Sequence, residues 1–236
     1  MKKRTRTRDQ LIPFQWFWTD EFGEKMGFRE WFKSRKFTIS YLITIWTIVS
    51  VLDFASTLDC TSTWQLAFAC DHAIWMGKMI TDPLNYVLSW FTAPFFHNSI
   101  DHILFVTVIG MMMPVQSFEV QYGSKATAIV FIVSYIWIGV FCGIFFNLGV
   151  EIWPEMDFMS FTFKRNWMGG SVGFYGLIGA LVYCSRKPWI LFSITFCFEL
   201  LNLFVIKIDP QITFAHANGL FIGYCCVWLM KKQKLI

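Results

Sequence analysis

Charge is scarce in this 236-residue chain: only 15% of the residues are Asp, Glu, Lys or Arg, against ~25% in an ordinary soluble domain. Hydrophobic residues make up 56% of the chain, above the usual ~45–50%. The sequence also lacks the Gly-, Ser- or Gln-rich stretches of disordered segments, and 19% of its residues are aromatic. A water-soluble globule and a disordered chain are both excluded by this composition. It predicts a protein whose solvent is lipid.

Apolar runs with at most one charged residue occur six times along the chain. A bilayer crossing needs about 20 mostly apolar residues, and the runs lie at 37–51, 100–116, 126–146, 171–184, 188–206 and 213–230. We therefore expect an all-α, multi-pass membrane protein without a large soluble domain. No cleavable signal peptide is expected, because the basic start is followed by an aromatic, charged stretch before any apolar core.

The distribution of cations predicts the orientation of these helices, since cytoplasmic loops carry an excess of Lys and Arg. Sixteen Lys and Arg lie on the side of the two termini, and the four on the other side are Lys78, Lys164, Arg165 and Lys207. Both termini are therefore expected in the cytoplasm, which requires an even number of spans. The net charge of +4 follows from this topology, so no nucleic-acid partner is expected.

Three segments follow: a basic, aromatic cytoplasmic segment at 1–36, a membrane domain at 37–230 and a basic tail at 231–236. Residues 11–32 mix aromatic and charged side chains, which indicates a segment lying on the cytoplasmic leaflet, or else a small partner-binding domain. The loop 56–99 is expected to dip into the outer interface. Its Cys60 and Cys70 form a disulfide if that compartment is oxidising, and no cysteine or histidine spacing indicates a metal site.

Few ionisable or nucleophilic groups lie inside the predicted spans, and those that do are functional candidates. They are His102, Ser171, Glu199 and His216. Glu199 is expected to pair within the helix bundle. The run that begins at Ser171 covers only ~22 Å at 1.5 Å per residue, short of a ~30 Å hydrocarbon core. Ser171 is therefore expected in a recess, beside the free N–H groups at the start of its helix.

Glycines recur at helical spacing in the fourth and sixth runs, which lets helix backbones approach closely. In the fourth run the glycines recur every third residue, and in the sixth they are four residues apart just after His216; they are Gly170, Gly173, Gly176, Gly179, Gly219 and Gly223.

Taken together, these residues resemble the motifs of the rhomboid intramembrane serine proteases. Residues 169–172 (GGSV) resemble the family's GxSG nucleophile motif, and residues 216–223 (HANGLFIG) resemble its HxxGxxxG motif. Residues 97–105 (HNSIDHILF) resemble the histidine-bearing start of its second helix, and residues 119–124 resemble its ExxxGS turn. The four motifs cover about residues 90–225. The resemblance implies a six-transmembrane-helix rhomboid-like bundle with cytoplasmic termini.

The resemblance also implies roles for single residues. Ser171 would be the nucleophile and His216 its general base, a dyad without a carboxylate, cofactor or metal. Tyr175, four residues after Ser171 on the same helix face, would pack against His216. His102 would line the oxyanion hole together with the backbone N–H of Ser171.

Two positions depart from the family pattern. Val106 stands where the family usually has an asparagine that donates to the oxyanion, and Val172 stands where it usually has a glycine. Loss of one oxyanion donor typically costs about 10²–10³ in rate, which weakens a protease without abolishing it. The β-branched Val172 is stiff and could crowd the recess.

Three functions are compatible with this pattern. The sequence favours an intramembrane serine endopeptidase that cleaves transmembrane or juxtamembrane segments, because inactive relatives generally lose the serine or the histidine. The alternative is a catalytically weak or inactive rhomboid-like protein that binds transmembrane helices for trafficking or quality control. A transporter is less favoured, since the two halves of the chain show no inverted repeat. The expected partners are transmembrane protein substrates and the lipid bilayer.

Overall fold

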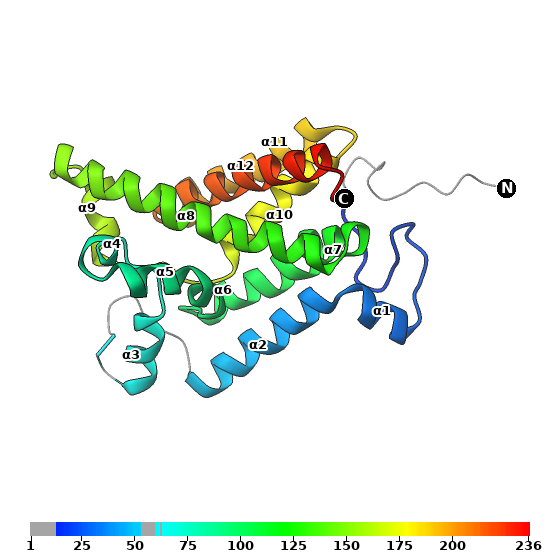
Figure 1. Ribbon diagram of the computed structural model, residues 1–236, viewed down its shortest axis with the longest axis horizontal. Helices are drawn as coiled ribbons and strands as arrows, with labels where there is room; N and C mark the ends of the chain where they lie inside the picture. The colour runs from blue at the N-terminus through cyan, green and yellow to red at the C-terminus, as the bar shows by residue number, and fades with distance from the viewer. Residues whose placement is uncertain (1–12, 53–59, 62) are drawn as a thin grey trace.

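The computed structural model describes residues 13–52, 60–61 and 63–236 (Figure 1). The first twelve residues of the predicted cytoplasmic segment, and residues 53–59 and 62 of the outer loop region, lie outside them. Helices dominate the described residues, in which two isolated β-bridges are the only strand pairing. The long helices are α2 (Lys36–Leu52), α8 (Ser124–Ile152), α10 (Ser171–Cys184), α11 (Pro188–Leu201) and α12 (Pro210–Lys232).

Two further long helices are composite. α6 (Ile100–Leu104), the π-helical η3 (Phe105–Val115) and α7 (Gln116–Tyr122) run on as one helix of 23 residues. Likewise α11 continues into the π-helical η5 (Asn202–Ile206). The short elements are α1 (Phe28–Ser34), α3 (Trp64–Asp71), α4 (Lys78–Thr81), α5 (Pro83–Thr92), η2 (Ala93–Phe95), α9 (Asp157–Ser160) and η4 (Phe161–Lys164).

Each of the six apolar runs predicted from the sequence falls on one of these helices. Length and apolar character alone identify four membrane spans: Ile100–Tyr122, Ser124–Ile152, Pro188–Ile206 and Pro210–Lys232. A fifth is formed if α1 and α2, which meet at 83°, are taken together. α10 is apolar but has only 14 residues. The protein is therefore an integral, multi-pass membrane protein.

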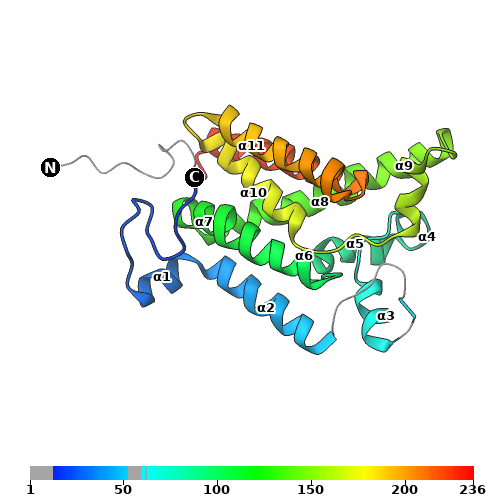
Figure 2. The ribbon, with the colours of Figure 1, turned by 180° about the vertical axis from the view of Figure 1, so that it is seen from behind.

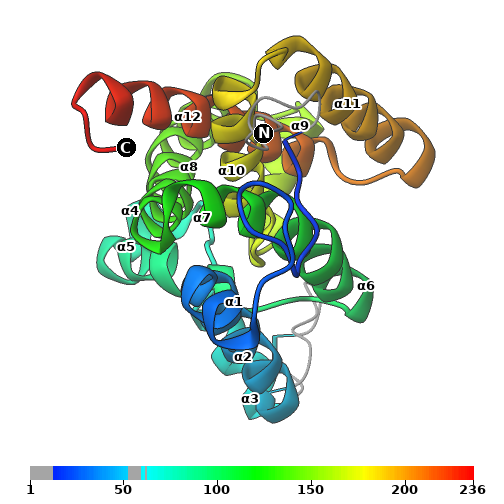
Figure 3. The same cartoon turned by 90° about the vertical axis from the view of Figure 1, so that its right-hand side faces the viewer.

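α10 lies near the centre of the molecule, as the end-on view in Figure 3 shows. Its first twelve residues, 171–182, are all buried. It packs against α12 and α8, and Figure 2 shows it between α11 on one side and the α6–α7 helix on the other. A helix that is apolar on every face and shielded by neighbours on every side can be shorter than the bilayer without exposing its ends to lipid.

The glycine stripes explain why α10 and α12 approach so closely. A Cβ built on Gly179 would collide with the backbone of Leu220, and one built on Gly223 would collide with the backbone of Gly176. At Gly219 the added atom would lie 2.8 Å from the carbonyl oxygen of Val172. The two helices are thus in backbone contact, which only glycine permits.

Two further glycines, one on α10 and one just before it, lie against side chains from other helices. A Cβ on Gly173 would overlap the ring of Phe131, and one on Gly170 would overlap the hydroxyl of Tyr41. The stripe therefore contacts α2 and α8 as well as α12, and it seats α10 in the centre of the bundle.

The ExxxGS turn fastens the start of α2 to the end of α7. The Glu119 carboxylate is buried and accepts hydrogen bonds from the backbone N–H groups of Phe37 (2.6 Å) and Thr38 (2.9 Å) and from the hydroxyls of Thr38 and Ser124 (2.7 and 2.6 Å). Free N–H groups at a helix start favour an anion. Gly123 has φ +86°, which lets the chain reverse between α7 and α8.

The described part of the aromatic N-terminal segment docks on Arg35, which is fully buried. The guanidinium donates to the carbonyl of Thr19 (2.5 Å) and to Gln116 Oε1 (3.0 Å), and it lies over the ring of Phe17. Burial lowers the pKa of Arg35 to about 10, although the nearby Glu119 acts in the opposite sense. The segment therefore packs on the end of the α6–α7 helix.

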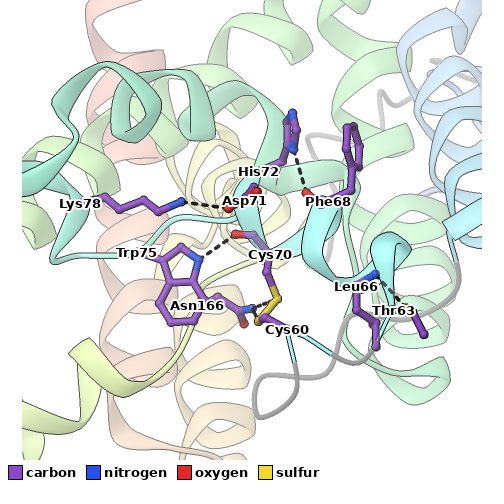
Figure 4. The surroundings of a disulfide bond; sticks show 10 residues. All are labelled: Cys60, Thr63, Leu66, Phe68, Cys70, Asp71, His72, Trp75, Lys78 and Asn166. Atoms are coloured by element: carbon purple, nitrogen blue, oxygen red, sulfur yellow. Dashed lines mark hydrogen bonds and ion pairs between the residues drawn. A yellow bond between two sulfur atoms is a disulfide. The ribbon is translucent and has the colours of Figure 1, made fainter.

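α1 and the C-terminus lie at one end of the long helices, and α3, α4, α5 and α9 lie at the other (Figure 1). At this second end Cys60 and Cys70 form a disulfide (Figure 4). The amide of Asn166 lies against the two sulfur atoms, 3.3 Å from Cys70 Sγ and 3.8 Å from Cys60 Sγ. Because Asn166 stands five residues before Ser171, the disulfide supports the chain that leads into α10.

Candidate active site

Ser171 is the first residue of α10 and is 7% exposed. It lines a cavity of about 410 Å³ together with Val172, Gly169, His102 and His216. A cavity of this size lies within the ~300–1,000 Å³ of typical ligand sites. Most of its wall is apolar, and its other polar side chains belong to Asn98, Ser99, Asp101, Tyr135, Arg165, Asn166 and Asn202.

The two residues before Ser171 are held by hydrogen bonds from several elements. Gly169 has φ +100°, a conformation that side chains rarely adopt, and its N–H donates to the carbonyl of Ala93 (2.9 Å). The carbonyl of Gly169 accepts from the hydroxyl of Tyr135 on α8. The N–H of Gly170 points to Nε2 of His97 (3.5 Å). The start of α10 is therefore fixed before any substrate arrives.

Further upstream, residues 74 and 167 form one of the two isolated β-bridges. Ile74 donates to the carbonyl of Trp167 (2.9 Å), and Trp167 donates back to the carbonyl of Ile74 (2.8 Å). An ion pair between Arg165 and Asp209 joins the same segment to the start of α12. Burial lowers the pKa of Arg165 from its ordinary value.

His216 lies on α12 and is 4% exposed. The ring of Tyr175 stacks on its imidazole, with centroids 4.1 Å apart and planes 8° from parallel. The sequence predicted this stack from the four-residue spacing between Ser171 and Tyr175. His216 Nε2 is buried and has no hydrogen-bond partner among the described residues. In structures without substrate, the bond from a nucleophile to its base is often long.

The other ring nitrogen of His216 faces a carboxylate. Nδ1 lies 3.2 and 3.3 Å from the two carboxylate oxygens of Glu199 on α11. The same carboxylate accepts from the hydroxyl of Tyr175 and from the amide of Asn202 (3.0 Å). Glu199 pairs within the bundle, as expected, but its partner is the candidate base. The family resemblance implied a Ser–His dyad without a carboxylate.

His102, in α6, also lines the cavity. Its ring packs on Gly169, where any side chain would overlap it. Its Nδ1 lies 2.9 Å from the amide oxygen of Asn98. Asn98, four residues before His102, also lines the cavity. The sequence motifs alone did not single out this asparagine, although its four-residue spacing from His102 is a usable signal.

The two departures from the family pattern occupy different places. Val106 is fully buried against Gly170 and does not line the cavity, so it offers the site neither a donor nor an obstruction. Val172 does line the cavity, and its Cγ1 lies 3.5 Å from the position a Cβ would take on Gly219. The branched side chain of Val172 thus packs beside Gly219 at ordinary contact distance.

His97, just before α6, packs beside His102 with ring centroids 5.1 Å apart. It is 1% exposed. Burial, and to a lesser degree His102, lowers the pKa of His97 from 6.5 to about 3. The ring is therefore neutral at physiological pH, and its Nε2 can accept from Gly170. Among the described residues, no group of three or more His, Cys, Asp or Glu side chains could hold a metal ion.

Comparison with known proteins gives one match. The family model of the Rhomboid domain matches residues 84–233, which is more than half of the chain and includes every cavity residue named above. No curated protein and no solved structure matches the chain significantly.

Proposed function

The chain belongs to the rhomboid family, whose members are generally intramembrane serine proteases, and from this premise we propose that it is an intramembrane serine endopeptidase. Its substrates would be transmembrane or juxtamembrane segments of membrane proteins. The observation that carries the proposal is the shared cavity of Ser171 and His216, with a free imidazole Nε2 and the start of a helix beside it.

In the proposed reaction, His216 Nε2 takes the proton of the Ser171 hydroxyl while Oγ attacks the scissile carbonyl carbon. The carbonyl's π pair moves to oxygen, and the resulting oxyanion faces the backbone N–H of Ser171 at the start of α10. His216 then gives its proton to the leaving amine as the peptide C–N bond breaks. Water completes the cycle by hydrolysing the acyl ester at Ser171.

Asn98 and His102 supply the donor that Val106 cannot. One hydrogen bond joins the amide to Nδ1 of His102, and it uses one donor and one acceptor. If the imidazole donates, the NH₂ group of Asn98 stays free; if the amide donates, His102 keeps its Nε2–H. In either arrangement the pair retains an N–H group for the oxyanion.

We expect Asn98→Leu to lower the turnover rate by about 10²–10³-fold, the usual cost of one oxyanion donor, with little change in KM. Cleavage kinetics on a transmembrane substrate would measure this. Asn85→Leu, on α5 and outside the cavity, is the matched control and should leave the rate unchanged. Equal rates for Asn98→Leu and the wild-type chain would eliminate the asparagine from the oxyanion hole.

Labelling by a fluorophosphonate in detergent or nanodiscs tests the activity itself. The wild-type chain is expected to label, Ser171→Ala is not, and His216→Ala should label only at a small residual rate. Ser193→Ala, at an exposed position on α11, and His72→Ala, in the outer loop region, are matched controls that should label normally. A folded wild-type chain that neither labels nor cleaves any model transmembrane substrate would refute the protease.

A rhomboid-like protein that binds transmembrane helices without cleaving them is the second candidate, favoured by the buried Val106 in place of a donor. It predicts that helix substrates crosslink to the chain, that nothing is cleaved, and that Ser171→Ala does not change crosslinking. The same labelling experiment separates the two functions.

The proposed topology has six spans with both termini in the cytoplasm. It is supported by the position of α1 and the C-terminus at one end of the helices and of the Cys60–Cys70 disulfide at the other, since disulfides persist in oxidising compartments. A glycosylation tag beside Cys60 should be modified in microsomes, and one at the C-terminus should not. The reverse pattern would overturn the topology.

A further inference from the structure

Glu199 is a carboxylate on a helix whose surface is largely exposed, yet its own side chain is turned inward and buried. Only 22% of the most apolar stretch of Pro188–Ile206 is buried. The Glu199 side chain, by contrast, is buried and only 8% of the residue is exposed. Placing an ionisable group at membrane depth is costly unless it is paired, and such groups are usually functional. Its three partners are Tyr175 on α10, Asn202 on η5 and His216 on α12.

These partners restrict the protonation of His216. An ionised carboxylate can only accept, so the imidazole nitrogen that faces it must carry the hydrogen. That nitrogen is Nδ1. A neutral imidazole with hydrogen on Nδ1 has its lone pair on Nε2, the nitrogen that has no partner in the described structure. Glu199 therefore selects the tautomer in which the base is ready to accept a proton.

Tyr175 contacts both His216 and Glu199. A general base must be held in one orientation, and the positive charge that it gains must be stabilised. The Tyr175 ring lies parallel to the imidazole at 4.1 Å, and its hydroxyl donates to the same Glu199 carboxylate. His216 is thus held against rotation by a stack on its face and a hydrogen bond at its edge. When Nε2 takes a proton, the imidazolium that forms lies beside a negative charge in a water-poor site, where the attraction is strong.

We infer that Glu199 is the third member of a Ser171–His216–Glu199 triad, a positioning residue that acts through His216. The inference rests on the proposed function and deepens it. Glu199 stays ionised throughout: the proton of Ser171 moves to Nε2, and the Nδ1 proton stays between the imidazole and the carboxylate.

The first test measures which ring nitrogen of His216 carries the hydrogen, and it does not require the protein to be active. The chain has only four histidines, so ¹⁵N-histidine labelling of the full chain in nanodiscs gives few signals, and His216→Ala assigns the one of interest. The wild-type chain should show hydrogen on Nδ1 of His216. Glu199→Gln should give a mixture of tautomers. Glu119→Gln, which removes a buried carboxylate far from His216, is the matched control and should leave the signal unchanged.

The second test reads the kinetics. Glu199→Gln should lower kcat by about 10²–10⁴-fold, with KM nearly unchanged, and Glu199→Asp should recover part of the loss. In the His216→Ala background, Glu199→Gln should change the residual labelling rate by less than about twofold, because residues that act as a unit are not additive. If Glu199 were merely structural, Glu199→Gln would lower the labelling rate by the same factor in the wild-type and His216→Ala backgrounds.

The outcomes separate the inference from the function. Hydrogen on Nε2 of wild-type His216, or a Glu199→Gln variant as active as wild type, would overturn the triad and leave the protease intact. A wild-type chain with hydrogen on Nδ1 but no serine-dependent activity would overturn the protease, and with it the catalytic role of Glu199.

Discussion

Replacing Gly223 by alanine tests the contact that positions the nucleophile and the base. The added Cβ would lie 2.7 Å from the Cα of Gly176 and closer still to its carbonyl group, whereas ordinary contacts begin at 3.4 Å. Both groups belong to the backbone and cannot rotate away. α10 and α12 must therefore part locally by roughly 1 Å, as over-packed cores do.

The energetic cost follows from two opposing terms. Overpacking costs about 1–3 kcal/mol, and alanine gains about 1 kcal/mol over glycine in a helix interior. Gly219→Ala gains the same helix propensity, but its Cβ would lie 2.8 Å from one carbonyl oxygen and 3.5 Å from its next neighbours. We expect Gly223→Ala to be less stable than Gly219→Ala by about 1–2 kcal/mol. Gly27→Ala, with no atom within 4 Å of the added Cβ, should be neutral.

In Gly223→Ala we expect a loss of activity larger than the loss of stability alone would cause. Gly176 follows Ser171 by five residues and Gly223 follows His216 by seven, so a displacement at their contact moves the two reacting groups apart. A 1 Å misplacement costs about 10²-fold in rate. Unfolding in mixed micelles and fluorophosphonate labelling of the same preparations measure both effects. If Gly223→Ala unfolds and labels like Gly27→Ala, the helices are not in backbone contact and the account of the glycine stripe is wrong.

Three further predictions concern the supports of the site. Reduction of the Cys60–Cys70 disulfide, or its replacement by two serines, should lower the free energy of unfolding by about 2–3 kcal/mol. The serine variant should be insensitive to reductant, whereas equal thermal midpoints of the wild-type chain with and without reductant would contradict the prediction. Glu119→Gln should destabilise the protein by about 2–4 kcal/mol, because backbone donors at the start of α2 lose their anion; a circular-dichroism melt indistinguishable from wild type would disprove the cap. His97 has a pKa of about 3 in the folded protein against 6.5 unfolded, so its contribution to stability is complete above pH 6.5 and is lost as the pH falls toward 3. The thermal midpoint of His97→Gln should therefore fall less than that of wild type between pH 7 and 4. Equal falls of the two midpoints would refute this role of His97.

The helices could be predicted from the sequence because lipid imposes a simple rule. Each of the six apolar runs, including the short run at 171–184, became a helix. The run at 100–116 passes through the π-helical η3, and the run at 188–206 ends in the π-helical η5. Hydropathy does not distinguish a π turn from an α turn, since both satisfy the backbone internally. The bend between α1 and α2 was likewise not predictable, because it depends on contacts of Arg35 with distant residues.

The site was predictable only where motif and spacing coincide. Ser171, His102 and His216 line one cavity, and Tyr175 stacks on His216 at the expected four-residue offset from Ser171. The contact of Glu199 with His216 joins residues 17 positions apart on two helices, and it depends on how α11 is rotated about its axis. A nearly uniform apolar helix such as α11 gives no periodicity from which that rotation could be read.

The same contact explains how a weakly buried helix stays in place. Lipid tails are as apolar as leucine, so the exposed face of α11 gains little from packing on its neighbours. The Glu199 carboxylate instead ties α11 to Tyr175 on α10 and to His216 on α12. An outward displacement of α11 would leave a buried charge and a buried imidazole without partners, at a cost of about 3–5 kcal/mol. A substrate segment that displaced α11 would therefore also release the base, so productive binding requires that the Glu199–His216 contact persists or re-forms before Ser171 is deprotonated.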